Sequence, residues 1–154
     1  MALRFRNLNV SPDDPVERWP VEAVQTAMER GSLRDWRRLI EVIDRDPWGK
    51  TARQVEHVLS YSRPYGVANL MERVLQSART RAERAERQAV AGKIRRAIAD
   101  SGLTRAEFAS HIGTSVSRLS TYATGKVAPS AALMVRIERV AAEATRQKAT
   151  KPGP

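Results

Sequence analysis

The chain of 154 residues contains no cysteine, which excludes disulfide bonds and thiolate metal sites and fits a reducing, cytoplasmic location. It also lacks any run of about eighteen apolar residues, so we expect no membrane-spanning helix. The first ten residues have no apolar core of the kind found in secretory signal peptides. With 42% hydrophobic and 29% charged residues, the composition is typical of one globular domain or two small ones.

Residues that commonly carry catalysis are scarce. The two histidines, His57 and His111, lie far apart in the sequence, and no glycine-rich phosphate loop or paired zinc-binding histidine motif occurs. The carboxylates occur singly on amphipathic segments, as they do on solvated helix faces. We therefore expect no enzymatic activity, no metal site and no cofactor.

Positive charge is abundant and unevenly distributed. Residues 1–80 hold 13 Lys and Arg against 11 Asp and Glu, whereas residues 81–154 hold 14 against 6. The second half therefore carries +8 of the formal net charge of +10. A partner lined with phosphates is the simplest reason for this excess, and a solvated basic surface with no polyanion is the alternative.

Apolar residues recur with a helical period and no segment alternates like a strand, so we predict an all-α fold. Residues 1–18 show no period and are expected to form an irregular arm over the first domain. Four helical segments predict that residues 19–78 form this domain. Within it, Thr51 and Gln54 are expected to form a helix-capping box.

A charged segment is expected to join this domain to a second one. Residues 79–89 hold no large apolar side chain and alternate Arg with Glu at spacings of three and four, which indicates a solvated helical linker. No glycine or proline interrupts residues 67–91, so one long helix is favoured over two helices with a bend. A second helical domain is predicted over residues 90–144, followed by a disordered basic tail over 145–154.

The stretch from residue 101 to 141 contains capping and turn residues at spacings that predict short helices joined by tight turns. Thr104 and Glu107 form a predicted capping box, and Ser115 is expected to cap the next helix. Gly113 supplies the turn between these helices, and Gly125 ends the second. Two short helices joined in this way are typical of a motif that places one helix in the major groove of DNA.

The sequence LTRAEFASHIGTSVSRLSTYATGKVAPS resembles the helix-turn-helix domain of the Cro and lambda-repressor-like family, also called the Xre family. The resemblance rests on the whole spacing, from Phe108-Ala109 through the two glycines to Pro129-Ser130, and implies double-stranded DNA as the partner. It implies base contacts from Val116, Ser117 and Thr121, and from Arg118 if its side chain turns inward. It implies phosphate contacts from four others: Thr104, Arg105, Ser115 and Lys126. Because none but Arg118 offers a bidentate base contact, readout by this helix is expected to be modest.

Two departures from the family pattern affect the prediction. Many family members have glutamate at the position of Ala123, paired with an arginine of the first helix. Here that first-helix position is assigned to Ile98, so apolar contact is expected to replace the ion pair. The chain also turns polar after Ala144, where the family often has a fifth helix that supplies the dimer contact. A homodimer is therefore expected to depend on the N-terminal domain or the long helix.

Two functions fit these observations. The first is a sequence-specific transcriptional regulator, most simply a repressor, with residues 19–78 as a dimerisation or sensing module. The alternative is the antitoxin of a toxin–antitoxin pair, whose N-terminal domain binds a protein partner while the C-terminal domain autoregulates the operon. Aromatic residues of the N-terminal half suit either a partner surface or, more simply, a core: Trp19, Trp36, Trp48, Tyr61 and Tyr65.

Overall fold

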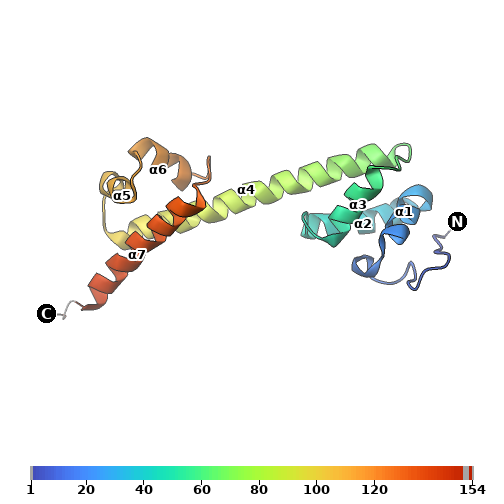
Figure 1. Ribbon diagram of the computed structural model, residues 1–154, viewed down its shortest axis with the longest axis horizontal. Coiled ribbons are helices and arrows are strands. Elements are labelled where there is room, and N and C mark those ends of the chain that lie inside the picture. The colour runs from blue at the N-terminus through green and yellow to red at the C-terminus, as the bar shows by residue number, and fades with distance from the viewer. Residues whose placement is uncertain (1, 151–152, 154) are drawn as a thin grey trace. The chain divides into compact units, whose positions relative to one another are not determined.

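The computed structural model describes residues 2–150 and 153, and within them it contains seven α-helices, one short 3-10 helix and no strand (Figure 1). The predicted all-α fold is confirmed. The chain folds as two compact units, Met1–Ala82 (unit 1) and Glu83–Pro154 (unit 2). The elements in chain order are η1 (Val16–Arg18), α1 (Val21–Arg30), α2 (Leu33–Arg45), α3 (Lys50–Leu59), α4 (Val67–Ser101), α5 (Arg105–Ile112), α6 (Val116–Ala123) and α7 (Ala131–Thr150).

Helix α4 belongs to both units, and its 35 residues form one uninterrupted helix (Figure 1). The predicted continuity of this helix is confirmed. The absence of glycine and proline from residues 67–91 explains it, since these are the residues that most readily end a helix. The single Gly92 is tolerated inside the helix.

Unit 1 packs α1, α2, α3 and the first part of α4 around one apolar core. Trp19, just before α1, is fully buried in this core, and Asp35 caps α2 by accepting hydrogen bonds from the Ser32 amide and hydroxyl. The expected capping box at Thr51 is wrong, because Gly49 occupies the cap position and α3 begins at Lys50, so that Thr51 lies buried within the first turn. Gln54 instead donates a hydrogen bond to the Trp19 carbonyl at 2.9 Å.

The N-terminal arm is irregular up to η1 but is packed on unit 1 through several apolar side chains. The Phe5 ring meets the Trp19 ring edge-on, with centroids 5.1 Å apart. Arg38 of α2 donates to the carbonyls of Pro12 (2.5 Å) and Asp14 (2.9 Å). The arm is therefore part of the folded unit, because it covers the indole of Trp19 and satisfies its own carbonyls through Arg38.

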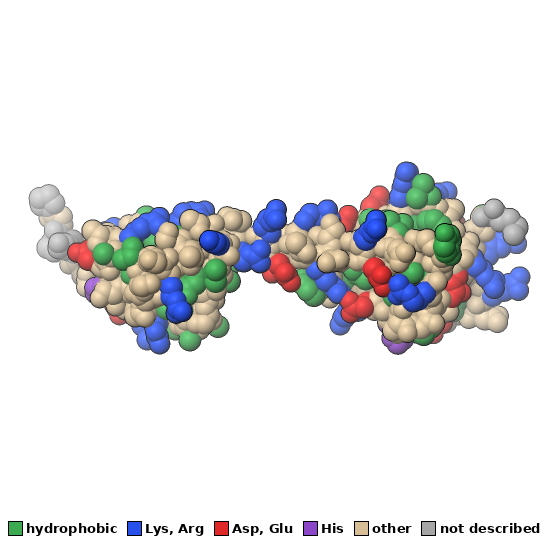
Figure 2. Space-filling view, turned by 90° about the horizontal axis from the view of Figure 1, so that it is seen from above, with side chains coloured by type: hydrophobic (Ala, Val, Ile, Leu, Met, Phe, Trp, Pro, Cys, Tyr) green, Lys and Arg blue, Asp and Glu red, His purple; other side chains and the backbone are tan. Residues whose placement is uncertain are grey.

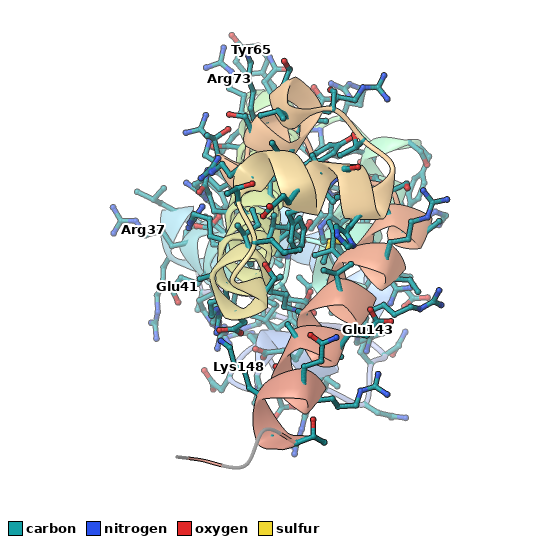
Figure 3. All side chains as sticks on the ribbon, turned by 90° about the vertical axis from the view of Figure 1, so that its left-hand side faces the viewer. Arg37, Glu41, Tyr65, Arg73, Glu143 and Lys148 are labelled. Carbon is teal, nitrogen blue, oxygen red and sulfur yellow. The ribbon has the colours of Figure 1, made fainter. Side chains whose placement is uncertain are left out.

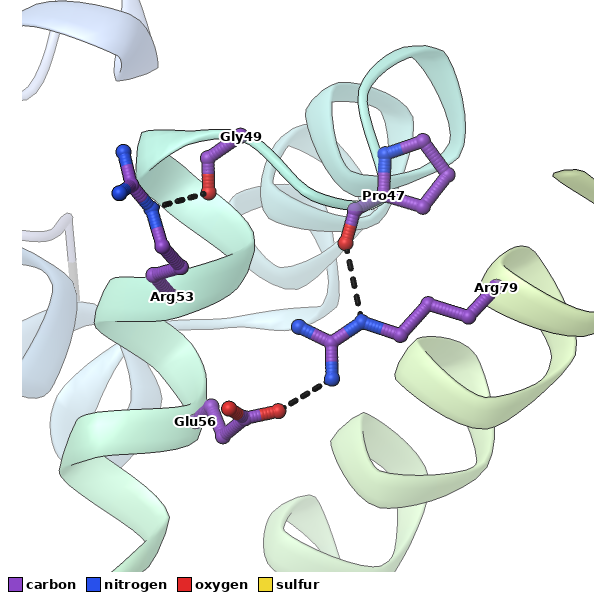
Figure 4. A network of polar contacts seen from close by, with 5 residues as sticks. All are labelled: Pro47, Gly49, Arg53, Glu56 and Arg79. Atoms are coloured by element: carbon purple, nitrogen blue, oxygen red, sulfur yellow. Dashed lines mark hydrogen bonds and ion pairs between the residues drawn. The ribbon is translucent and has the colours of Figure 1, made fainter. Parts of the chain in front are cut away.

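The segment 79–89 is helical, and its first residues contact unit 1. The Arg79 guanidinium lies 4.7 Å from the centre of the Trp48 ring, donates to the Pro47 carbonyl at 3.0 Å and pairs with Glu56 (Figure 4). One side chain of α4 thus ties together the α2–α3 connection and α3. Arg81 pairs with Asp44 at 2.8 Å, with both side chains largely in solvent.

Unit 2 packs the last part of α4 against α5, α6 and α7. Its core is formed by apolar side chains from all four helices, and the largest of them are fully buried: Ile94, Phe108, Ile112, Leu119 and Ile137. Ala109, also buried, has a small side chain that lets the neighbouring helices approach α5 closely.

Helix α7 continues to Thr150, so the disorder expected over residues 145–150 is wrong. The segment TRQKAT holds helix-forming residues and no glycine or proline, which allows the helix to extend. Lys148 points from α7 toward the end of α4 (Figure 3) and donates to the Asp100 carbonyl at 3.3 Å. Residues 151, 152 and 154 of the expected tail lie outside the described residues. No helix in the described part of the chain is both long and apolar enough to cross a bilayer.

Replacing Arg79 by alanine should lower the free energy of unfolding of unit 1 by roughly 1–2 kcal/mol, because a carbonyl bond and a cation–π contact are lost together. Tryptophan fluorescence during urea unfolding measures this, since all three tryptophans lie in unit 1. The matched control is Arg81→Ala, whose exposed ion pair should contribute less than about 0.5 kcal/mol. Equal losses in both variants would show that the Trp48 and Pro47 contacts add nothing.

Candidate nucleic-acid interface

Helix α5 begins with the predicted capping box. The Thr104 amide donates to the Glu107 carboxylate at 2.8 Å, and the Glu107 amide donates to the Thr104 hydroxyl at 3.2 Å. Arg105, the first helical residue, is exposed beside this cap. The start of α5 therefore presents a threonine and an arginine at the N-terminus of a helix, the end that favours anions.

The turn between α5 and α6 is fixed by backbone hydrogen bonds. Gly113 has a φ of 76°, in the left-handed region, and the Thr114 amide donates to the Ala109 carbonyl at 2.9 Å. This pattern closes the end of α5 as a Schellman motif does. The Ser115 hydroxyl accepts from the Arg118 amide at 3.2 Å and so caps α6, which leaves its hydrogen available to donate to a phosphate.

Three of the four residues expected to contact bases are exposed on α6. Val116 is 48% exposed, and Ser117 and Arg118 are also exposed, whereas Leu119 on the opposite side is fully buried. Thr121 is only partly exposed, and its hydroxyl donates to the Arg118 carbonyl at 2.7 Å. Thr121 is therefore the least available of the four for a base contact, and it keeps only acceptor capacity.

The last of the expected phosphate contacts, Lys126, lies in the turn after α6. Its amide donates to the Thr121 carbonyl at 3.0 Å while its side chain is exposed, and Gly125 before it has a φ of 78°. Lys126 thus follows the end of α6, while Arg105 and Ser115 stand at the starts of α5 and α6. The four positions that resemble phosphate contacts belong to one short stretch of two helices and their turns.

Among the described residues of unit 2, no basic side chain forms an ion pair with a carboxylate. All four ion pairs that the structure records lie in unit 1, and none joins a carboxylate to a Lys or Arg of residues 83–150. Figure 2 shows Lys and Arg side chains standing out on the surface of both units, with few acidic ones on the visible face of unit 2. Unpaired like charges repel one another, and a polyanion would relieve this repulsion.

The end of α6 makes polar contacts with α4 that the sequence did not predict. Arg95 of α4 donates to the Ala123 carbonyl at 2.6 Å, and Gln88 of α4 donates to the Thr124 carbonyl at 3.2 Å. Ile98 does pack in the same apolar cluster as Ala123, but apolar contact alone does not replace the ion pair of the family. The available signal was Arg95 itself, which lies one helical turn before Ile98 and so on nearly the same face.

Comparison with protein families gives a match to this part of the chain. A family model described as helix-turn-helix matches residues 94–141, from the last turns of α4 into α7. No curated protein and no solved structure matches the chain. Residues 94–141 are thus a helix-turn-helix domain of the Cro/C1 type, which confirms the resemblance seen in the sequence. This match supports DNA binding by the helix-turn-helix domain.

Two alanine substitutions at glycine should change the stability of unit 2 in opposite directions. Gly113→Ala places a side chain at φ 76° and should cost roughly 1–2 kcal/mol. Gly92→Ala, inside α4 with nothing nearer than 3.8 Å to the added Cβ, should stabilise by about 0.5–1 kcal/mol. Far-UV circular dichroism during unfolding would follow the transition that tryptophan fluorescence does not report. A Gly113→Ala variant as stable as the wild type would contradict the tight-turn assignment.

Proposed function

We propose that this protein is a sequence-specific transcriptional regulator, most simply a repressor, that places α6 in the major groove of double-stranded DNA. The observation that carries the proposal is the exposed face of Val116, Ser117 and Arg118 on a short, capped helix within a helix-turn-helix domain. The unpaired basic side chains of unit 2 support the same partner. The proposal assigns the protein no catalytic role and no cofactor, and places it in the cytoplasm.

Affinity and specificity would come from different side chains. Phosphate contacts from Arg105, Lys126 and the hydroxyls at Thr104 and Ser115 would fix the register of the domain without reading sequence. On α6, Val116 suits a thymine methyl group, Ser117 suits several bases, and Arg118 alone offers a bidentate contact to guanine. This small set of readers implies that DNA shape and bridging water contribute to specificity.

Unit 1 would then serve dimerisation or sensing. A dimer formed through unit 1 or α4 would present two helix-turn-helix domains to a two-fold symmetric operator. This arrangement would raise specificity, because the base contacts of α6 would be made at two half-sites of the same DNA.

A second candidate, the antitoxin, is favoured by the surface of unit 1. Trp19 is buried in the core, but Tyr65 is fully exposed and Tyr61, Trp48 and Leu33 are each about half exposed. Exposed aromatic side chains are typical of surfaces that bind a protein. In this variant of the proposal, unit 1 holds a toxin protein while unit 2 binds the promoter of the shared operon.

Selection from a random double-stranded DNA library with the purified full chain tests DNA recognition directly. The expected outcome is enrichment of one motif with two-fold symmetry and, by light scattering, the mass of a dimer. Footprinting on the DNA upstream of the gene should then show protection of a matching site. Failure to enrich any sequence over the starting library would contradict sequence-specific binding.

Replacing Arg105 or Lys126 by alanine should weaken binding to every DNA sequence and lower the slope of log affinity against log salt by about one unit each. The reason is that each lost phosphate contact releases one fewer counterion. Fluorescence anisotropy over a salt series measures both quantities. Arg37→Ala, an exposed arginine of α2 in unit 1, removes the same charge and should leave the slope unchanged. An unchanged slope in the Arg105 and Lys126 variants would remove these residues from the interface.

A further inference from the structure

We propose that Gln88 and Arg95 are positioning residues for DNA recognition, holding the C-terminal end of α6 from α4 and so setting the orientation in which α6 meets the groove. The inference rests on the proposed DNA binding and adds two residues that do not belong to the exposed face of α6. Gln88 also lies outside the matched helix-turn-helix segment, residues 94–141. The functional DNA-binding unit therefore begins earlier on α4 than the family match does.

The two contacts are made side by side. Gln88 and Arg95 are seven residues apart on α4, which is two helical turns, so they project from the same face. Ala91 lies between them on that face and is fully buried. Their donors reach the carbonyls of consecutive residues, Thr124 at 3.2 Å and Ala123 at 2.6 Å. Gln88 and Arg95 therefore hold the last turn of α6 through hydrogen bonds to two consecutive carbonyls.

The electrostatics of a helix end favour this arrangement. The last carbonyls of a helix have no partner within it and carry a partial negative charge. Arg95 brings a full positive charge to that end, and charge-assisted hydrogen bonds are the stronger kind. Residue 123 is an alanine and carries no carboxylate, and Arg95 bonds its backbone carbonyl.

The packing at Gly125 shows that Gln88 sits close against the end of α6. A Cβ atom added at Gly125 would lie 2.5 Å from Gln88 Nε2. Lys126, a proposed phosphate contact, follows directly in the chain. The Gln88 contact thus fixes both the last turn of α6 and the start of the turn that carries Lys126.

Helix α6 depends on such contacts because it is short. It has eight residues, and only Leu119 and Ala123 among them are buried. Ala123 contributes little packing at the C-terminal end because its side chain is a single methyl group. Hydrogen bonds to bases require the recognition helix to be placed within a fraction of an ångström. Loss of the Gln88 and Arg95 hydrogen bonds should therefore weaken base contacts more than phosphate contacts.

The experiment compares Gln88→Ala and Arg95→Ala with the wild-type full chain on two DNA duplexes, the sequence selected from the random library and a scrambled duplex of the same length and composition. The readout is the ratio of the two affinities at fixed salt, with the salt slope measured on each duplex. The expected result is a roughly tenfold fall in the ratio for either variant, about the discrimination that one good base contact supplies. Affinity for the scrambled duplex should change much less.

Three controls separate positioning from other roles. Lys93→Ala removes an exposed charge from the other side of α4 and should leave the ratio unchanged. Arg95→Lys keeps a cationic donor and should restore most of the ratio. If Arg95 instead contacted a base through its guanidinium, lysine would not restore the ratio. Circular dichroism checks folding, and Gln88 is exposed, so Gln88→Ala tests the inference even if Arg95→Ala destabilises unit 2.

Two results would overturn the inference while leaving DNA recognition intact. One is an unchanged ratio in both alanine variants. The other is an equal loss on both duplexes with the salt slope lowered by about one unit in Arg95→Ala, which would make Arg95 a phosphate contact. A wild-type chain with no preference for the selected duplex would instead overturn the proposed function, and this inference with it.

Discussion

The backbone groups at the ends of two eight-residue helices are the constraint on which the DNA-binding unit depends. A helix of this length leaves about as many amides and carbonyls unpaired at its ends as it pairs inside. In α5 and α6 the first amides donate to the hydroxyls of Thr104 and Ser115, and the last carbonyls accept from the amides of the left-handed glycines Gly113 and Gly125. The C-terminal carbonyls also take donors from the long helices, Arg136 of α7 at Ile112 and Arg95 of α4 at Ala123. The motif is thus completed by side chains outside it.

Helix α4 supplies different contacts to each unit along its length. Its first part contributes apolar residues and Arg79 to unit 1, and its last part contributes Ile94 to the core of unit 2 and Gln88 and Arg95 to the end of α6. The stretch 79–89 was predicted as a solvated linker because it lacks large apolar side chains. Its polar residues nevertheless make specific contacts at both ends, since Arg and Gln reach carbonyls that apolar side chains cannot satisfy.

Local signals in the sequence predicted local structure well. Capping at Thr104 and Ser115, the turns at Gly113 and Gly125, and the continuity of α4 all follow from interactions within about five residues. The Thr51 cap was wrong because α3 begins before it and Thr51 is buried within unit 1, where packing outweighs the local preference of threonine. The contacts of Gln88 and Arg95 span 36 and 28 residues, so they depend on how the helices pack, and neighbouring residues in the sequence do not specify their partners. The site residues on α6 were found only through the resemblance to a family.

The two units use their basic side chains differently. Unit 1 pairs arginines with carboxylates, as at Arg63 and Glu72, where the hydrogen bond from Arg63 lowers the pKa of Glu72. Unit 2 uses Arg95 and Arg136 on backbone carbonyls, which satisfies their donors without cancelling their charge. The same arginines can therefore stabilise unit 2 and still leave it with a positive charge that attracts a polyanion. If α6 enters the major groove as proposed, its few base-specific side chains would make recognition depend more on this field and on the fixed orientation of the helix than on the number of base contacts.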